Sequence, residues 1–257
     1  MPTVKDILSY LFTLAPEHYK VSWDNIGLMC GHSDSPVSGI LVALDASLPV
    51  AEEAARLGCE LVVVHHPLIF TETSAVSDET ITGLRLLSYL EKHISVISMH
   101  TNLDCAPGGV NDVLAQRLGL RDVQVLEDGE IAHLVRYGTV PKQSLAQFLP
   151  FVKQQLHCPG LRYADGGRPV CRVAVGGGSC GEYLPQLRKL GCDTFVTADV
   201  SYHRFADASE LGMNLIDAGH FETENPVVQM LCDKLAEQFP EVAVKVSTEH
   251  RDVTEYA

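Results

Sequence analysis

Short apolar segments alternate with helical segments along most of the chain, and this alternation constrains the fold more than any other feature. An apolar strand is predicted at residues 40–44, a helix from about 49 to 57 that ends at Gly58, and a second strand at 61–64. Two strands joined through a helix lie parallel, so this segment is a βαβ unit. The alternation resumes after Cys171. It predicts an α/β fold with two interlinked α/β lobes and largely parallel sheets.

The same patterns predict the other elements and a division of the chain. Apolar residues at helical spacing between Val4 and Phe12, behind a capping box of Thr3 and Asp6, predict an N-terminal helix. We expect an N-terminal lobe at 1–125, a second lobe at 126–209 and a C-terminal segment at 210–257. The remaining predicted helices are 80–92, 109–118, 144–156 (interrupted or kinked at Pro150), a helix ending at 190, 202–211 and 226–238. The remaining predicted strands are 94–99, 131–140, 173–175, 193–197, 213–216 and 242–246.

Composition and charge exclude several classes of protein. No apolar run approaches the roughly 20 residues that span a bilayer, and the chain does not start with a basic, then apolar, secretory signal. Eight cysteines occur without any C-x-x-C pair, which predicts reduced thiols and a cytoplasmic protein. The net charge of −14 argues against nucleic acid as a partner.

Side chains that can bind metals follow three of the predicted strands. The carboxyl ends of parallel strands meet at one edge of a sheet, where α/β proteins place their sites. A single histidine after a strand is usually an ordinary surface residue, but three such groups in equivalent positions favour a functional site. The groups are His65 with His66 after 61–64, His100 with Asp104 after 94–99, and His220 with Glu224 after 213–216.

The chemistry of these donors indicates a dinuclear metal centre. Imidazole and carboxylate ligands suit zinc, manganese, iron, cobalt or nickel, and the metal's identity stays open. Six donors exceed what one tetrahedral ion takes but match two ions about 3.5–4 Å apart, with Asp104 as the natural bridge. Such a centre would favour an anionic substrate, such as a phosphate or a nucleotide, and would activate water at neutral pH.

A glycine-rich segment from Gly176 to Gly181 satisfies the pattern G-x-G-x-x-G. A dinucleotide site is one hypothesis, with Asp199 as its acidic residue. A tight turn between a strand and a helix is the simpler one. A third is that the amides of Gly177 and Gly178 receive a substrate phosphate. In the segment around Trp23, Asp24 and Asn25 are predicted either to orient metal ligands or to stabilise a turn.

Four motifs give the chain a family resemblance. They are W-D-N-I-G-L from Trp23, V-V-H-H-P-L-I-F from Val63, S-M-H-T-N-L-D from Ser98, and D-A-G-H-F-E-T-E from Asp217. Together they resemble the NGG-one-interacting-factor-three-like family, the GTP cyclohydrolase 1 type 2 homologues. The resemblance implies a homohexameric ring of two-lobed subunits with a dinuclear metal site. It places the metal ligands at His65, His66, Asp104, His220 and Glu224, and it selects Glu224 over Glu222.

The resemblance also includes His100, as a ligand or a proton-transfer group, and we assign it a catalytic role. The function expected is hydrolysis of a nucleotide-like or phosphorylated substrate, with two divalent metal ions per subunit as cofactors. The alternative is a metal-handling or regulatory ring protein without catalysis. A binding scaffold that keeps an ancestral site is a third possibility. Expected partners are other copies of the chain and an anionic small molecule, with no membrane.

Overall fold

The computed structural model describes residues 1–127 and 132–256, which form two compact units. Unit 1 consists of Met1–Ala106 together with Val228–Arg251, and the rest of the described chain forms unit 2. The predicted boundaries after residues 125 and 209 do not coincide with these units. Unit 2 already begins at Pro107, and the chain returns to unit 1 at Val228.

Unit 1 contains a five-stranded sheet in the order β1-β4-β3-β2-β11. The four strands from β4 to β11 pair in parallel, and only the edge strand β1 is antiparallel. The predicted βαβ unit is confirmed, with Ile40 in register with Leu61. The strands are β1 (Gly27–Cys30), β2 (Gly39–Ala43), β3 (Leu61–Val64), β4 (Ser95–Ser98) and β11 (Ala243–Val246).

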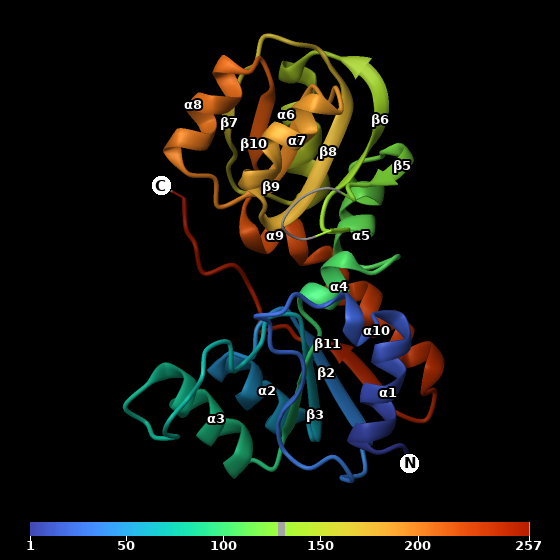
Figure 1. Cartoon of the computed structure of the whole chain (residues 1–257). Helices are drawn as coiled ribbons and strands as arrows, with labels where there is room; N and C mark the ends of the chain where they lie inside the picture. Colours follow the sequence, from blue (N-terminus) through green and yellow to red (C-terminus); the bar gives the residue numbers. More distant parts are fainter. Residues whose placement is uncertain (128–131, 257) are drawn as a thin grey trace. The chain divides into compact units, whose positions relative to one another are not determined.

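Helices cover both faces of this sheet. Buried side chains of α2 and α3, such as Val50 and Tyr89, pack against Val62 and its neighbours in one core, and α1 and α10 lie on the opposite side (Figure 1). Thr3 and Asp6 form the predicted capping box at the start of α1. The helices are α1 (Val4–Leu14), α2 (Leu48–Leu57), α3 (Ile81–Glu91), α4 (Thr101–Cys105), most of α10 (Pro226–Gln238) and the 3-10 turn η1 (Glu17–Tyr19).

Unit 2 contains a six-stranded mixed sheet in the order β5-β6-β8-β9-β10-β7. Its centre, β8-β9-β10, is parallel, as expected. The strands outside this centre pair antiparallel, so the expectation of a largely parallel sheet holds here only for the centre. The strands are β5 (Arg121–Val125), β6 (Arg136–Gln143), β7 (Arg162–Ala164), β8 (Val170–Ser179), β9 (Thr194–Ala198) and β10 (Asn214–Asp217).

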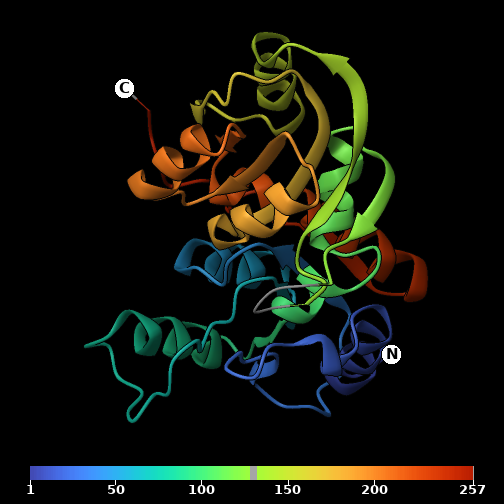
Figure 2. The same ribbon diagram turned by 45° about the horizontal axis from the view of Figure 1, so that its top comes forward.

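The helices of unit 2 also form two layers. Leu114 of α5 and Phe148 of α6 pack with Val173 in a core on one face of the sheet, and α7 and α8 lie on the other face (Figure 2). Helix α6 is continuous in spite of Pro150. The helices are α5 (Val110–Arg117), α6 (Leu145–Leu156), α7 (Leu184–Lys189), α8 (Tyr202–Glu210), α9 (His220–Glu224) and the 3-10 turn η2 (Gly181–Tyr183).

The glycine-rich segment differs from its prediction. Strand β8 continues through the glycines to Ser179 instead of ending at residue 175, so these glycines do not form a turn into a helix. The register against β9 shifts between Val175 and Ser179, where Gly178 has φ +62°. A side chain would be strained in that conformation, which explains a glycine at this bulge. Of the predicted strand 131–140, Ile131 lies outside the described residues, and β6 begins at Arg136.

Two further findings concern the chain as a whole. Among the described residues, no helix combines the length and the apolar character needed to cross a membrane. All eight cysteines are free thiols, and six of them are buried. The burial of most of these thiols agrees with the expectation that they act as small apolar side chains.

Candidate metal centre

Three histidines of unit 1 converge beyond the carboxyl ends of two neighbouring parallel strands. His65 and His66 directly follow β3, and His100 follows β4 by two residues. One ring nitrogen from each of the three lies within 4.8 Å of the others. The His65 ring is buried, and the other two are partly buried. The expectation that strand ends bring these residues together is therefore met within unit 1.

The three rings are held through the same nitrogen. Nδ1 of His65 lies 2.8 Å from the carbonyl oxygen of Met99. Nδ1 of His66 and Nδ1 of His100 each lie 2.8 Å from a carboxylate oxygen, of Asp45 and Asp24 respectively. These oxygens only accept hydrogen bonds, so Nδ1 carries the proton and Nε2 is the nitrogen that would coordinate a metal.

Asp104 lies next to the histidine cluster. It follows His100 on the short helix α4, and its Oδ1 is 3.4 Å from Nε2 of His65. Both side chains are buried. A carboxylate and three imidazoles are a donor set that suits divalent transition metals, so these residues fit the group that the sequence predicts.

Asp24 is the residue that fixes His100. Its side chain is fully buried and also accepts hydrogen bonds from the amide and the hydroxyl of Thr101. Burial alone would raise the pKa of this carboxyl. The hydrogen bond from His100, the charge of that ring and the hydrogen bonds from Thr101 outweigh burial and lower the pKa from 3.8 to about 2. Asp24 is therefore ionised, and it orients His100 within the candidate centre, as one of the two roles predicted for it requires.

Unit 2 carries the other predicted donors on α9. Nε2 of His220 is 3.0 Å from Oε2 of Glu224, one helical turn away. Nδ1 of His220 is 2.7 Å from Oδ2 of Asp199. This repeats the arrangement in unit 1, with a carboxylate on Nδ1 and Nε2 directed at a second donor.

Asp199 has a different role from the one weighed for it in a dinucleotide site. It follows β9 with φ +50°, a left-handed conformation that aspartate tolerates better than most residues. Since its carboxylate accepts the His220 hydrogen bond and the nearby glycines lie within β8, the geometry of a dinucleotide-binding turn is not present at this position.

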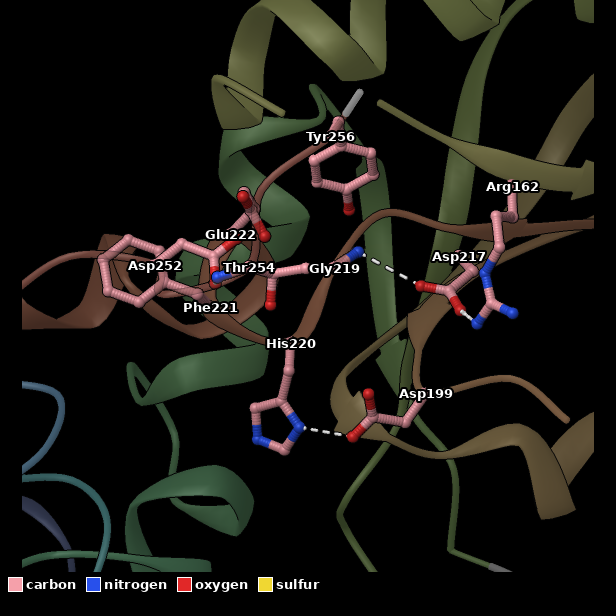
Figure 3. A pocket seen from close by; sticks show the side chains of 10 residues that line it. All are labelled: Arg162, Asp199, Asp217, Gly219, His220, Phe221, Glu222, Asp252, Thr254 and Tyr256. Carbon is pink, nitrogen blue, oxygen red and sulfur yellow. Dashed lines mark hydrogen bonds and ion pairs between the residues drawn. The ribbon is translucent and has the colours of Figure 1, made fainter. Parts of the chain in front are cut away.

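Glu222 lines a pocket of about 300 Å³ within unit 2 (Figure 3). Its neighbours there include Arg162, Asp217, Asp252 and Tyr256. Burial raises the pKa of Glu222, and the carboxylates of Asp252 and Asp217 raise it further. His220 thus has Glu224, not Glu222, as its partner on α9.

Gly177 and Gly178 lie directly beside His220 and Glu224. The Gly177 amide donates a hydrogen bond to Asn111 (2.7 Å), and the Gly178 amide donates to Thr223 (3.1 Å). A phosphate would have to displace these acceptors, so the phosphate role of the two glycines stays a prediction. Gly178 leaves room for the Glu224 side chain, because a Cβ at this position would lie 2.3 Å from Oε1 of Glu224.

Asp45 was not predicted from the sequence, and Asp199 was predicted in a different role. Each carboxylate holds the histidine 21 residues further along the chain, His66 or His220. Each also follows the strand that pairs in parallel with the strand before its histidine. That topological relation could have revealed them, since aspartates at strand ends are otherwise ordinary loop residues.

Comparison with known proteins agrees with the resemblance. Residues 2–253 match the family model described as Duf34/NIF3, the NGG1p interacting factor 3 family. The chain belongs to the DUF34/NIF3 family.

Relatives of the DUF34/NIF3 family match over most of their length. A protein of Clostridium perfringens called "GTP cyclohydrolase 1 type 2 homolog" is 32% identical over 98% of this chain and 99% of its own. One of the same name from Clostridium acetobutylicum is 33% identical over 90% of this chain and 89% of its own. The crystal structure of a hypothetical protein of Staphylococcus aureus superposes with a TM-score of 0.91, at 28% identity over 99% of both chains.

Proposed function

We propose that the protein is a divalent-metal-dependent hydrolase of a nucleotide-like or otherwise phosphorylated substrate. In this proposal the ligand set implied by the family resemblance holds two divalent ions, and His100 transfers protons beside them. The ligands are His65, His66, Asp104, His220 and Glu224. Resemblance to the family motifs and the donor geometry within each unit support this assignment.

The observation that carries the proposal is the common orientation of the four histidines. In each, Nδ1 is held by a carboxylate or a carbonyl oxygen at 2.7–2.8 Å. Such contacts fix the ring and its tautomer in metal sites, and a solvated surface histidine has no need of them. Four instances among residues that the sequence had already selected favour a metal centre over a structural cluster.

The charges indicate the substrate class. Two divalent ions bring four positive charges, and the carboxylates of Asp104 and Glu224 offset two of them. When bound, the ions would lower the pKa of a coordinated water and stabilise negative charge on a phosphoryl group. His100 is placed to accept a proton at Nε2, and the ionised Asp24 would stabilise the resulting imidazolium through Nδ1.

Turnover by metal-loaded protein tests the proposal. The purified protein is assayed with GTP, phosphomonoesters and phosphodiesters, and GTP enters because the relatives carry that substrate in their name. We expect turnover of at least one class and its loss in Asp104→Ala. Lack of turnover, or equal turnover in Asp104→Ala, would show that the protein is not a metal-dependent hydrolase acting on these substrates.

The metal-handling alternative uses the same donors and differs in metal exchange. A hydrolase keeps its metal through repeated cycles of substrate hydrolysis, whereas a delivery protein releases metal to an acceptor. Loaded protein is mixed with a chelator of moderate affinity, and the rate of metal transfer is compared with the rate of turnover. Fast transfer without hydrolysis would favour metal handling.

We also propose, from the family resemblance, that six copies assemble into a ring in the cytoplasm. Light scattering on purified protein measures the assembly directly. A monomer or dimer at micromolar concentration would contradict the ring.

A further inference from the structure

Two exposed aromatic side chains of unit 1 lie next to the histidine cluster. Trp23 and Phe70 are 55% and 53% exposed, although large aromatic side chains usually lie mostly buried. Their rings meet edge to face, with centroids 5.9 Å apart. Phe70 in turn meets the ring of His100, with centroids 6.1 Å apart. We call Trp23 and Phe70 the aromatic shelf.

The shelf is held in place by the segment that also fixes His100. Asp24, directly after Trp23, accepts the His100 hydrogen bond. Asn25 donates from its side chain to the carbonyl oxygen of Ile69, 2.7 Å away, and so fastens the residue before Phe70. Three consecutive residues thus supply one ring of the shelf, hold a histidine of the cluster and anchor the loop with the second ring.

We propose that the aromatic shelf binds the planar nitrogenous ring of the substrate, while the charged end of that substrate reaches the metal centre. The inference rests on the proposed function for that centre. Exposed aromatic rings bind nucleobases by stacking, with a contribution that does not depend on the particular base. A mononucleotide joins a planar ring to a phosphate through a single sugar, which fits a shelf in contact with His100. The shelf therefore selects nucleotide-like substrates over phosphates that lack a planar nitrogenous ring.

Trp23 provides its own readout, because it is the only tryptophan of the chain. Zinc-loaded protein is titrated with AMP and with ribose 5-phosphate, which keeps the sugar and the phosphate but lacks the planar base. We expect AMP to change the Trp23 fluorescence and to bind about tenfold more tightly than ribose 5-phosphate.

Variants assign the effect to the shelf. By calorimetry, Trp23→Leu and Phe70→Leu should each weaken AMP binding towards that of ribose 5-phosphate and leave ribose 5-phosphate binding unchanged. Tyr202→Leu removes an aromatic ring that is 80% exposed in unit 2, and it should change neither affinity.

Three results would overturn the shelf. One is equal affinity for AMP and ribose 5-phosphate, or no binding of either, in the wild-type protein. Another is unchanged AMP affinity in both shelf variants. The third is dissociation of the assembly in those variants by light scattering, which would make the two rings an interface between copies. Turnover is measured separately: a ring preference without hydrolysis contradicts the hydrolase alone, and hydrolysis without a ring preference contradicts the shelf alone.

Discussion

The carboxylate of Asp24 lies 2.8 Å from Nδ1 of His100, 76 residues further along the chain. Through this contact a buried, ionised group determines which nitrogen of His100 carries the proton. The segment before β1 therefore helps to orient the candidate metal centre, although it supplies no predicted ligand.

Replacing Asp24 with asparagine should lower turnover by the metal-loaded protein without unfolding unit 1. The amide keeps the shape of the side chain but loses the charge that orients His100, and the loss of such a partner typically costs about 10- to 100-fold in activity. Steady-state turnover measures the loss, and circular dichroism checks the fold. Asp34→Asn changes an exposed carboxylate as a control. A change below about twofold in Asp24→Asn would show that His100 needs no such partner.

Glu224→Gln and Glu222→Gln form a matched pair on α9. Of the two, it is Glu224 that contacts Nε2 of His220, whereas Glu222 lines the neighbouring pocket. We expect Glu224→Gln to lose metal affinity by on the order of tenfold or more, and Glu222→Gln to keep it. Metal content after dialysis, measured by mass spectrometry, separates the two. Equal losses would mean that the family pattern misassigns the ligand.

Gly178→Ala should damage the donor pair more than the fold. Its φ of +62° makes any side chain cost about 1–2 kcal/mol, and the new Cβ would approach Oε1 of Glu224 to 2.3 Å. Gly167→Ala is the control, because its φ is +70° and a Cβ there meets nothing within 4 Å. Both variants should lose similar stability in urea, but only Gly178→Ala should lose metal. Normal metal binding in Gly178→Ala would show that Glu224 and His220 can move aside.

Glu53 predicts a pH-dependent contribution to stability. Its buried carboxylate accepts hydrogen bonds from residues 247–249, which follow β11. Burial raises its pKa, but hydrogen bonds from Ser247, Thr248 and Glu249 outweigh this and lower it from 4.5 to about 2. The stabilisation is thus complete above pH 4.5 and is lost as the pH falls towards 2.

Glu53→Gln should therefore destabilise the protein by about 1.5–3 kcal/mol at pH 7, the usual range for hydrogen bonds to a charged group. The difference from wild type should shrink as the pH falls from 5 to 3. Urea unfolding at several pH values measures both. The neighbouring Glu52 is 68% exposed in its pair with Lys92, and Glu52→Gln should have a much smaller effect. A pH-independent difference for Glu53→Gln would rule out the charge as its cause.

Much of the fold and of each donor set could be predicted from local patterns. Strands β3 and β4 are buried throughout, so their apolar runs stand out, and the histidines after them are conspicuous. The edge strands β5 and β7 are short and largely exposed, so no apolar pattern marks them. The roles of Asp45 and Asp199 depend on which strands pair with each other, and local sequence patterns do not reveal that pairing.

The two units share more than an α/β layout. In each, an aspartate after one strand holds a histidine after the next parallel strand, 21 residues later. Both pairs belong to a βαβ arrangement, β2-α2-β3 in unit 1 and β9-α8-β10 in unit 2. The two units therefore build equivalent Asp–His contacts at equivalent strand ends.

The return of the chain to unit 1 has a consequence for its synthesis. The sheet of unit 2 is complete at Asp217, whereas unit 1 needs β11 and the residues bound by Glu53, which lie between 243 and 249. On a ribosome, the N-terminal part of unit 1 must wait for residues 243–249 before its sheet can close. Unit 2 can fold while unit 1 still lacks an edge strand. The middle of the sequence therefore folds before the segments on either side of it.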